Sequence, residues 1–322
     1  MRLIALIASV FVVISVPALA ANVGFEEIKI GNGTEPPLTV GIWYPSSNAR
    51  GDFTQTVVPG ASIAGNSLPL VVMSHGGGGR YDSHSDTALA LARAGFVAAA
   101  ISHAGDTTDD QSKVLQLWRR PAQFRRLVDY MLNEWPNHGH LDPARVGAFG
   151  FSNGGFTVLV AVGGVPDLSK TRPYCEAHPD HDLCTALKHA AVDADLGANV
   201  PADAWIPDLR IKAAVVVAPE FAYAFTPAGL RAVRAPIQLW RAADDHHQPH
   251  PFYEEALRAA LPQAPEYHVV ANAGHYDFLA PCSARLSRKA LDICTSLPGF
   301  DRAAFHERFN AELARFFQAM PR

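Results

Sequence analysis

Short apolar runs alternate with amphipathic segments along most of the 322-residue chain. This alternation is typical of an α/β protein, in which helices cover both faces of a mostly parallel central sheet. The run 68–74 (LPLVVMS) is apolar at nearly every position, as expected of a strand that is buried on both faces. In chain order, strands are predicted over residues 25–30, 38–44, 68–74, 96–101, 145–151, 211–218, 236–241 and 266–270.

Helices are predicted between these strands. The segments 84–94 and 122–135 have helical patterns, and the second is stopped by Pro136. A buried helix is predicted from Asn153 onward, because the apolar run TVLVAV follows it. The closing segment forms one apolar helical face, made of Phe305, Phe309, Leu313, Phe316 and Phe317.

Residues 165–209 interrupt the alternation. They are rich in Pro, Asp and His and show no clear sheet pattern. A segment of this length without regular structure usually forms a lid or a binding loop in a compact domain. We interpret 165–209 as a lid-like insertion above the strand ends, within one domain that spans residues 21–322.

The first twenty residues have the pattern of a cleavable signal peptide. Arg2 supplies a positive start, the apolar run 3–16 follows, and Ala18-Leu19-Ala20 gives the small-x-small cleavage pattern. Cleavage is predicted after Ala20, and an uncleaved anchor helix is the alternative. No later segment is long and apolar enough to cross a bilayer. The protein is therefore predicted to be exported, either to a periplasm or to the medium, without stable membrane insertion once the signal is removed.

Export would place the four cysteines in a compartment where disulfides persist. Cys175 and Cys184 lie nine positions apart, and Cys282 and Cys294 lie twelve apart. The local pairing 175–184 and 282–294 is the most economical of the three connectivities. A zinc site built from all four cysteines is the alternative, but the spacings are wider than those of usual zinc knuckles.

The charge of the chain limits its partners. The formal net charge is −4 at pH 7, and Lys and Arg form no stripe or block. Nucleic-acid-binding proteins usually carry a basic patch, so nucleic acid is not predicted as a partner. The sequence makes no prediction of the oligomeric state.

The stretch 147–155 (GAFGFSNGG) contains the pattern G-x-S-x-G, with Ser152 at its centre. It falls where a predicted strand ends and a predicted helix begins. A sharp strand-to-helix turn strains the serine backbone and requires small neighbours, which Gly150 and Gly154 provide. A plain helix N-cap is the alternative role for the serine, but it does not explain these glycines. Ser152 is therefore predicted to be a nucleophile.

A serine hydroxyl is a weak nucleophile at neutral pH and needs an adjacent base. In proteins with this strand–turn–helix pattern, the partners follow in the chain order serine, acid, histidine. His275 stands in AGHYDFL (273–279), a loop between the last predicted strand and the closing helix. From there an imidazole can reach the ends of the strands, whereas His268 lies within a strand and His306 on the final helix. His275 is the predicted base.

Three carboxylates are candidates for the acid that orients this base. Asp245 lies in the loop after the predicted strand 236–241 and fits the usual strand–loop–Asp layout. A buried carboxylate at that place would accept the imidazole Nδ1–H and stabilise the imidazolium. Asp244 is one residue off and is expected to point the other way. Glu220, which follows the preceding strand, remains an alternative.

Acyl transfer also needs two donors aimed at the charge that develops on the carbonyl oxygen. The N–H of Asn153, directly after the serine, is one predicted donor. The other is predicted from SHGGGG (74–79), whose glycines let the backbone approach a ligand closely, and Gly77 is favoured. A phosphate-binding loop is the competing interpretation, but no Lys-Ser/Thr follows the glycines.

Several further side chains lie near predicted strand ends. His75, His103 and Tyr276 are candidates for substrate contact, with bracing of neighbouring loops as the alternative for the two histidines. Two polar clusters offer ligands of the kind that divalent metals favour. They are His246, His247 and His250 beside Asp244 and Asp245, and His178, Asp180, His181 and Asp182. Adjacent histidines rarely converge on one ion, so no metal is predicted.

The motifs together resemble the α/β-hydrolase superfamily. Within it, the chain is similar to the predicted dienelactone hydrolase group, which is related to secreted platelet-activating-factor acetylhydrolases. The matching stretches, which span most of the mature chain in the expected order, are PLVVMSHGGGG (69–79), GFVAAAISHAG (95–105), LDPARVGAFGFSNGG (141–155), RAPIQLWRAADD (234–245) and AGHYDFLAPC (273–282).

The resemblance implies the α/β-hydrolase fold and serine-dependent ester hydrolysis. In this chain it implies Ser152 as nucleophile, Asp245 as acid and His275 as base, with Gly77 and Asn153 as oxyanion donors. Two departures matter. True dienelactone hydrolases use a cysteine nucleophile, and the acetylhydrolase relatives take their acid from the preceding strand, where Glu220 lies here.

The sequence therefore predicts an exported serine carboxylesterase that acts through an acyl-enzyme on small-molecule or lipid esters without a cofactor. A phospholipid acetylhydrolase-like lipase is one alternative, suggested by the family kinship and the lid-like insertion. A non-catalytic exported binding protein of the same fold is another.

Overall fold

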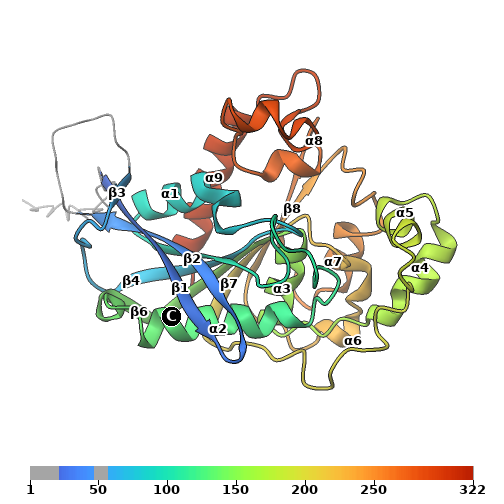
Figure 1. Ribbon diagram of the computed structural model, residues 1–322, viewed down its shortest axis with the longest axis horizontal. Coiled ribbons are helices and arrows are strands. Elements are labelled where there is room, and N and C mark those ends of the chain that lie inside the picture. Colours follow the sequence, from blue (N-terminus) through green and yellow to red (C-terminus); the bar gives the residue numbers. More distant parts are fainter. Residues whose placement is uncertain (1–21, 47–56, 322) are drawn as a thin grey trace, which may run out of the picture.

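The computed structural model describes residues 22–46 and 57–321 (Figure 1). The predicted signal peptide, residues 1–20, lies outside the described residues. Nine strands in the described part of the chain form one sheet, in the order β3-β1-β2-β5-β4-β6-β7-β8-β9. In chain order they are β1 (Asn22–Asn32), β2 (Glu35–Ser46), β3 (Val57–Pro59), β4 (Leu68–Ser74), β5 (Val97–Ser102), β6 (Leu141–Phe151), β7 (Ile211–Val217), β8 (Ile237–Ala242) and β9 (Glu266–Val270).

The sheet is mostly parallel, as predicted. Strands β5, β4, β6, β7, β8 and β9 run parallel to one another. Strand β2 is antiparallel to both β1 and β5. Because parallel strands share one carboxyl edge, the loops that follow β4, β6, β7 and β8 gather at the same edge of the sheet.

The helices of the described chain are α1 (Ser85–Arg93), α2 (Arg119–Asn133), α3 (Asn153–Ala161), α4 (Thr171–Ala177), α5 (Asp182–His189), α6 (Pro227–Leu230), α7 (Glu254–Ala260), α8 (Leu291–Cys294) and α9 (Arg302–Gln318). Helices α1 and α9 pack on one face of the sheet, and α2 and α3 pack on the other (Figure 1). The predicted closing helix corresponds to α9, and the helix predicted over 84–94 corresponds to α1.

The two faces of the sheet carry separate apolar cores. In β4, Leu70 and Val72 belong to the core beneath α2 and α3. Val71 and Met73 of the same strand belong to the core beneath α1 and α9. Successive side chains of a strand point to opposite faces, so a strand between two helical layers must be apolar at every position. This explains the continuous apolar run of β4 and its full burial.

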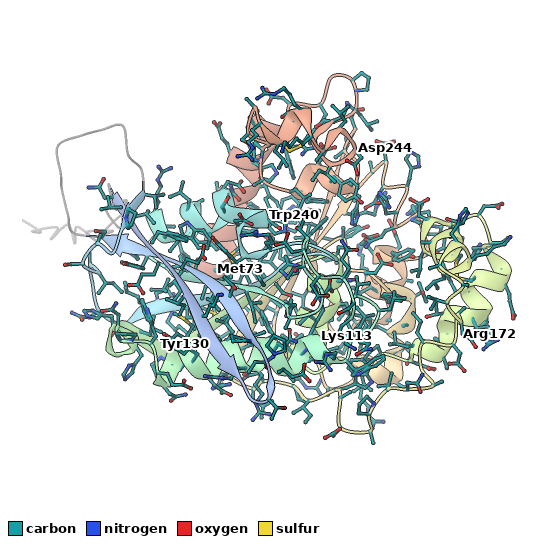
Figure 2. The ribbon with its side chains drawn as sticks, in the orientation of Figure 1. Met73, Lys113, Tyr130, Arg172, Trp240 and Asp244 are labelled. Carbon is teal, nitrogen blue, oxygen red and sulfur yellow. A yellow bond between two sulfur atoms is a disulfide. The ribbon has the colours of Figure 1, made fainter. Side chains whose placement is uncertain are left out.

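The insertion 165–209 is more regular than the sequence pattern predicts. It contains helices α4 and α5, which lie at one side of the molecule (Figure 1). Arg172 of α4 lies at the outer edge of the molecule in Figure 2. These helices have only seven and eight residues, too few for a clear amphipathic period. A disulfide joins Cys175 of α4 to Cys184 of α5 and so ties the two helices together.

A second disulfide joins Cys282 to Cys294, at the end of α8. Both disulfides connect the pairs that the sequence spacing favours. Among the described residues, no helix combines the length and the apolar character needed to cross a membrane.

Candidate active site

Ser152 occupies a strained turn between β6 and α3. Its backbone has φ 54° and ψ −119°, a region that residues with a side chain rarely adopt. The flanking positions must be glycine because neighbouring backbone atoms lie too close to them for a side chain to fit. A Cβ added at Gly150 would lie 2.1 Å from the Gly154 carbonyl oxygen, and one added at Gly154 would lie 2.0 Å from the Ser74 carbonyl oxygen. The two glycines of the motif therefore allow the turn that holds the serine.

Backbone hydrogen bonds fix this turn to the neighbouring strand end. The Ser152 N–H donates to the Val217 carbonyl at 2.9 Å, and the Ser152 carbonyl accepts from the Glu220 N–H at 3.1 Å. The serine side chain is close to the surface, with 8% of the residue exposed. Among the described residues its hydroxyl has no hydrogen-bond partner, which is common for catalytic groups before a substrate binds.

His275 and Asp245 form a buried pair at the same edge of the sheet. His275 begins a short 3₁₀ helix, His275–Phe278, after β9, and Asp245 follows β8. The Nδ1 atom of His275 lies 2.8 Å from Oδ2 of Asp245. The other carboxylate oxygen of Asp245 accepts from the Gln248 backbone N–H at 2.9 Å. The ring of Phe151 lies 4.7 Å from that of His275, centroid to centroid, and so connects His275 to the Ser152 turn.

The pair shifts the pKa of each partner in the direction expected of an ion pair. Burial by itself would lower the pKa of His275, but the charge and the hydrogen bond of Asp245, followed by the charges of Glu220 and Asp182, raise it above its ordinary value. Burial would raise the pKa of Asp245, yet the charge and the hydrogen bond of His275 hold it below its usual range. Asp245 therefore stays ionised and stabilises a protonated His275.

The other two candidate acids occupy different positions. Asp244 is exposed, and its backbone N–H bonds to the Ala273 carbonyl (Figure 2). Glu220 is buried, and its Oε2 accepts from the Gln248 side chain at 3.3 Å. No hydrogen bond joins either residue to His275 within the part of the chain that the structure describes. Burial raises the pKa of Glu220, so its charge is less available than that of Asp245.

The insertion reaches the site through α5. The Asp182 carboxylate pairs with His247 Nδ1 at 2.9 Å. The ring of His247 lies 5.1 Å from the ring of His275 and 4.9 Å from that of Tyr276. Tyr276, a predicted substrate contact, is half-buried beside the base. His247 thus links the insertion to the His275–Asp245 pair, a contact that the sequence did not indicate.

The glycine loop after β4 lies against the serine turn. A Cβ added at Gly76 would lie 3.3 Å from the Cβ of Ser152, and one added at Gly77 would lie 2.9 Å from Nδ2 of Asn153. Asn153 is the first residue of α3, and N–H groups of a first helical turn have no partner within the helix. The predicted oxyanion donors, Gly77 and Asn153, are therefore neighbours in space.

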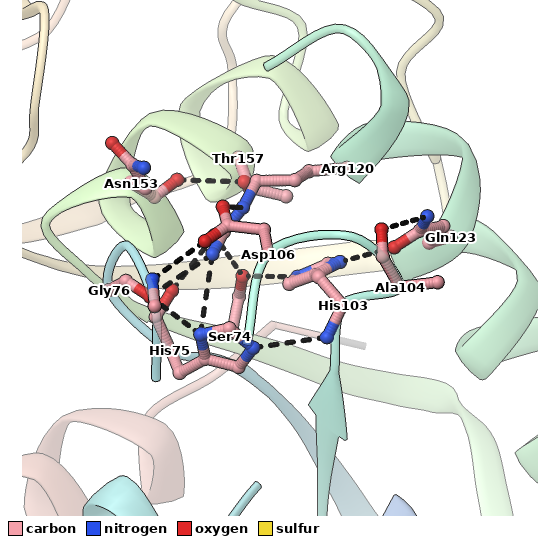
Figure 3. Close-up of polar contacts among 11 residues, drawn as sticks. Ser74, His75, Gly76, His103, Ala104, Asp106, Arg120, Gln123, Asn153 and Thr157 are labelled. Carbon is pink, nitrogen blue, oxygen red and sulfur yellow. Dashed lines mark hydrogen bonds and ion pairs between the residues drawn. The ribbon is translucent and has the colours of Figure 1, made fainter. Parts of the chain in front are cut away.

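His75 and His103 lie beneath this loop, buried and bonded to protein groups (Figure 3). The Nε2 atom of His75 accepts from the His103 backbone N–H at 3.0 Å, so Nδ1 carries the proton and donates to the Gly76 carbonyl at 2.6 Å. His103 contacts Ser74 Oγ through Nε2 at 2.8 Å and Gln123 Oε1 through Nδ1 at 2.9 Å. All four ring nitrogens have protein partners, which favours the bracing alternative; contact of these histidines with a substrate stays a prediction.

Sequence reasoning missed two charged residues of this buried group, Arg120 and Asp106. Both are 2% exposed, and Arg120 Nε lies 2.8 Å from Asp106 Oδ2. The helix over this region was predicted to begin at residue 122, but α2 begins at Arg119 and so includes Arg120. The signal that could have identified them is the aspartate of SHAGD (102–106), a charge directly after a buried strand.

The histidine clusters considered as metal sites do not converge on one point. His247 pairs with Asp182, whereas His250 pairs with Glu255 at 2.6 Å. His181 Nδ1 shares a hydrogen bond of 2.7 Å with the Tyr174 hydroxyl. In the described ranges, the ligand atoms that approach within 4.8 Å of one another belong to Glu266, His268 and Glu312. This group lies on β9 and α9, and Arg315 pairs with both of its glutamates.

No family model and no curated protein matches the chain. Among solved structures, the ferulic acid esterase from Streptomyces cinnamoneus is similar, with 18% sequence identity and a TM-score of 0.61 over 95% of this chain and 92% of that chain. The dienelactone hydrolase from Anabaena variabilis is also similar, with 15% identity and a TM-score of 0.55 over 92% of this chain and 99% of that one. Both likenesses extend over nearly the whole chain, and they show that it has the α/β-hydrolase fold.

Proposed function

We propose that the protein is a serine hydrolase that cleaves carboxylic esters. The observation that carries this proposal is the gathering of three groups at one edge of the sheet: the strained Ser152 turn, the buried His275–Asp245 pair and the glycine loop at Gly77. A strained serine, a base with its orienting acid and a pair of backbone donors are the parts that acyl transfer requires. The similarity to an esterase structure supports the same reaction class.

In the proposed reaction, Ser152 Oγ attacks the ester carbonyl carbon while His275 Nε2 takes the hydroxyl proton. The negative charge that develops on the carbonyl oxygen is stabilised by the N–H groups of Gly77 and Asn153. His275 then donates the proton to the leaving alkoxide, and an acyl-enzyme remains on Ser152. Water, deprotonated by His275, attacks the carbonyl carbon of this ester. The bond to Ser152 Oγ breaks, His275 returns the proton to Oγ, and the acid is released. Asp245 keeps His275 in the tautomer that has the proton on Nδ1 and a free Nε2.

The proposal is tested with p-nitrophenyl acetate and with the variant Ser152→Ala. The wild-type protein should hydrolyse the ester and react with a fluorophosphonate probe at Ser152, and the variant should do neither. If the folded Ser152→Ala protein hydrolysed the ester at the wild-type rate, the proposal would be wrong. Labelling by the probe also separates an esterase from a non-catalytic binding protein of the same fold, because only an activated serine reacts.

We further propose that the substrates are small-molecule esters and that the insertion 165–209 covers one side of the site. The contact between Asp182 and His247, next to His275, supports this place for the insertion. A panel of esters with graded acyl length, methyl ferulate among them, would rank the acyl groups. A phospholipid with a short acetyl chain tests the lipase alternative, which predicts release of acetate from lipid faster than from simple esters.

Export is proposed as well. The two disulfides support it, because such bonds persist in oxidising compartments. The N-terminal sequence of the mature protein tests it directly, since cleavage after Ala20 predicts a chain that begins at Ala21.

A further inference from the structure

A buried ion pair lies beside the glycine loop (Figure 3). Arg120, in the first turn of α2, and Asp106, in the loop after β5, are each 2% exposed and meet at 2.8 Å. A buried ion pair is expensive to form, because both charges lose their hydration, and apolar residues of similar size often stabilise a fold equally well. The burial of this pair beside the glycine loop therefore points to a role beyond stability.

Arg120 holds two consecutive carbonyl groups of the loop. Its Nη1 donates to the His75 carbonyl at 2.8 Å, and its Nη2 donates to the Gly76 carbonyl at 3.1 Å. The Gly76 oxygen also accepts from His75 Nδ1 at 2.6 Å. Asp106 holds the next peptide group, because its Oδ1 accepts from the Gly78 N–H at 2.6 Å. The two charged side chains thus fix three successive peptide groups.

Because these carbonyl groups are held in place, the geometry of the peptide bond also fixes the direction of the N–H groups in the same peptides. In a trans peptide the C=O and N–H bonds point in opposite directions. The Gly76 carbonyl belongs to the same peptide group as the Gly77 N–H, so a carbonyl turned toward Arg120 turns the Gly77 N–H away from it. The His75 carbonyl fixes the Gly76 N–H in the same way. Ser152 and Asn153 of the serine turn lie against the same two glycines, Gly76 and Gly77.

We propose that Arg120 and Asp106 are positioning residues that orient the Gly76–Gly77 peptide so that its N–H faces the developing oxyanion. This inference rests on the proposed function and adds to it two residues that touch no substrate. Donors of this kind lower the barrier because they are already oriented when the charge forms. Without the clamp, the glycines, which have the freest backbone of all residues, could rotate the peptide and turn the carbonyl toward the substrate.

Arginine suits this task better than lysine. Its planar guanidinium presents several donors in a fixed arrangement, and here Nε, Nη1 and Nη2 each have an acceptor. A lysine has its three donors on a single nitrogen and cannot reproduce the spread of Nε, Nη1 and Nη2 toward Asp106 and the two carbonyls. The substitution Arg120→Lys therefore keeps the charge of the pair while it loosens the peptide.

The test compares Arg120→Lys, Arg120→Met and Asp106→Asn with Arg119→Lys as the matched control. Arg119 is the preceding residue of α2, and its side chain pairs with Glu35 at the surface, at 2.5 Å. Each protein is assayed with p-nitrophenyl acetate. Each is also titrated with a trifluoromethyl ketone, which Ser152 Oγ attacks to form a tetrahedral adduct whose oxyanion occupies the proposed hole. Binding of the product acid and thermal unfolding are measured in parallel.

Loss of a single oxyanion donor costs about 10²–10³-fold in kcat. We expect Arg120→Lys to lower kcat/KM by about 10- to 100-fold and Arg120→Met by more, with Asp106→Asn between the control and Arg120→Met. The inhibition constant of the ketone should rise by the same factor as kcat/KM falls, while the affinity for the product acid stays unchanged. Arg119→Lys should stay within about twofold of the wild type, because its contact lies away from the loop.

The proposal is overturned if folded Arg120→Lys and Asp106→Asn match the Arg119→Lys control in kcat/KM. It is also overturned if the melting temperature falls while the ketone binds as tightly as before, since that result indicates a structural role alone. Should the Arg120 variants not fold, Asp106→Asn decides, because its amide oxygen can still accept from Gly78 while the charge and the hydrogen bond that Arg120 Nε donates are lost. A wild-type protein that is neither active nor labelled at Ser152 would instead refute the proposed function itself.

Discussion

His275 Nδ1 lies 2.8 Å from Oδ2 of Asp245, and both side chains are almost completely buried. The second buried carboxylate of the site, Glu220, makes its side-chain hydrogen bond with Gln248 and none with the imidazole. A carboxylate that accepts the Nδ1–H fixes the tautomer of the base, whereas one that acts only through its charge does not. The geometry therefore favours Asp245 over Glu220 as the acid.

The variants Asp245→Asn and Glu220→Gln test this assignment. Asp245→Asn should lower kcat by about 10⁴-fold, because the amide can donate to the imidazole and stabilise the wrong tautomer. Glu220→Gln should lower kcat by about tenfold at most, because it removes only an electrostatic contribution. Steady-state rates with p-nitrophenyl acetate measure both effects, and circular dichroism checks the fold. The reverse order of the two losses would assign the acid to Glu220.

The pH dependence of the reaction should show the raised pKa of His275. The base must be neutral in the free enzyme, so kcat/KM should rise with pH through a pKa above the ordinary histidine value. Asp182, on the insertion, is one of the charges that raise this pKa. Asp182→Asn should therefore move the acid limb of the pH profile to lower pH. Asp180→Asn, an exposed neighbour in the turn before α5, is the matched control and should leave the limb in place.

A profile of Asp182→Asn that coincides with that of the control would contradict the proposed approach of the insertion to the site.

The raised pKa of His275 also has a consequence for stability. Because the folded pKa of His275 is raised, its contribution to stability is full below the unfolded pKa and is lost as the pH rises through the folded value.

The positions of the site residues could be predicted where their chemistry constrains the local sequence. The turn around Ser152 needs glycines on both sides, and those glycines appear in the sequence as a motif. His275 could be predicted because it lies in a polar loop between the last strand and the closing helix. In both cases the required feature is formed by neighbouring residues, so it can be seen without knowledge of the fold.

Contacts between distant segments could not be predicted in this way. Arg120 and Asp106 are ordinary charged residues in the sequence, and their burial follows only from the packing of α2 against the loop after β5. Likewise, Asp182 comes near His247 only because α5 folds back over the site. The bracing role of His103 depends on partners from β4 and α2. No local sequence motif marks these residues, and their roles follow only from contacts in the folded structure.

The Asn153 side chain should be replaceable, although the residue follows the nucleophile. Its proposed role uses the backbone N–H, which Asn153→Ala retains. We expect kcat/KM of Asn153→Ala within about fivefold of the wild type, measured with p-nitrophenyl acetate. A loss of 100-fold or more, the size expected for a lost oxyanion donor, would mean that the side-chain amide itself stabilises the transition state.

The disulfide of the insertion should stabilise α4 and α5 locally. Cys175 and Cys184 close a loop of about ten residues, for which the chain-entropy estimate is about 3 kcal/mol. In the double variant Cys175→Ala/Cys184→Ala, limited proteolysis should cut first within the insertion, before the sheet unfolds. Mass spectrometry of the fragments identifies the site of cleavage. First cuts outside residues 165–209 would show that other contacts hold the insertion in place.

His84 should make the fold sensitive to acid. Its ring is buried, with the rings of Phe149 and Phe151 at 5.0 and 5.3 Å, and this burial lowers the pKa of His84 to about 4 in spite of the nearby Asp86. The unfolded chain binds the proton near pH 6.5, so the contribution to stability is full above that pH and is lost as the pH falls toward 4. The difference between the two pKa values corresponds to about 3 kcal/mol.

The variant His84→Phe keeps an aromatic ring between the two phenylalanines and cannot be protonated. Denaturant unfolding at pH 7 and at pH 4.5 should show a smaller loss of stability for His84→Phe than for the wild type, by roughly 2–3 kcal/mol. His189→Phe, at the exposed end of α5, is the control and should follow the wild-type curve. Groups that do not interact with His84 affect the wild type and His84→Phe alike, so the comparison reports on His84 together with Asp86, whose pKa His84 helps to lower. Equal losses in His84→Phe and the wild type would mean that the acid sensitivity of the fold arises elsewhere.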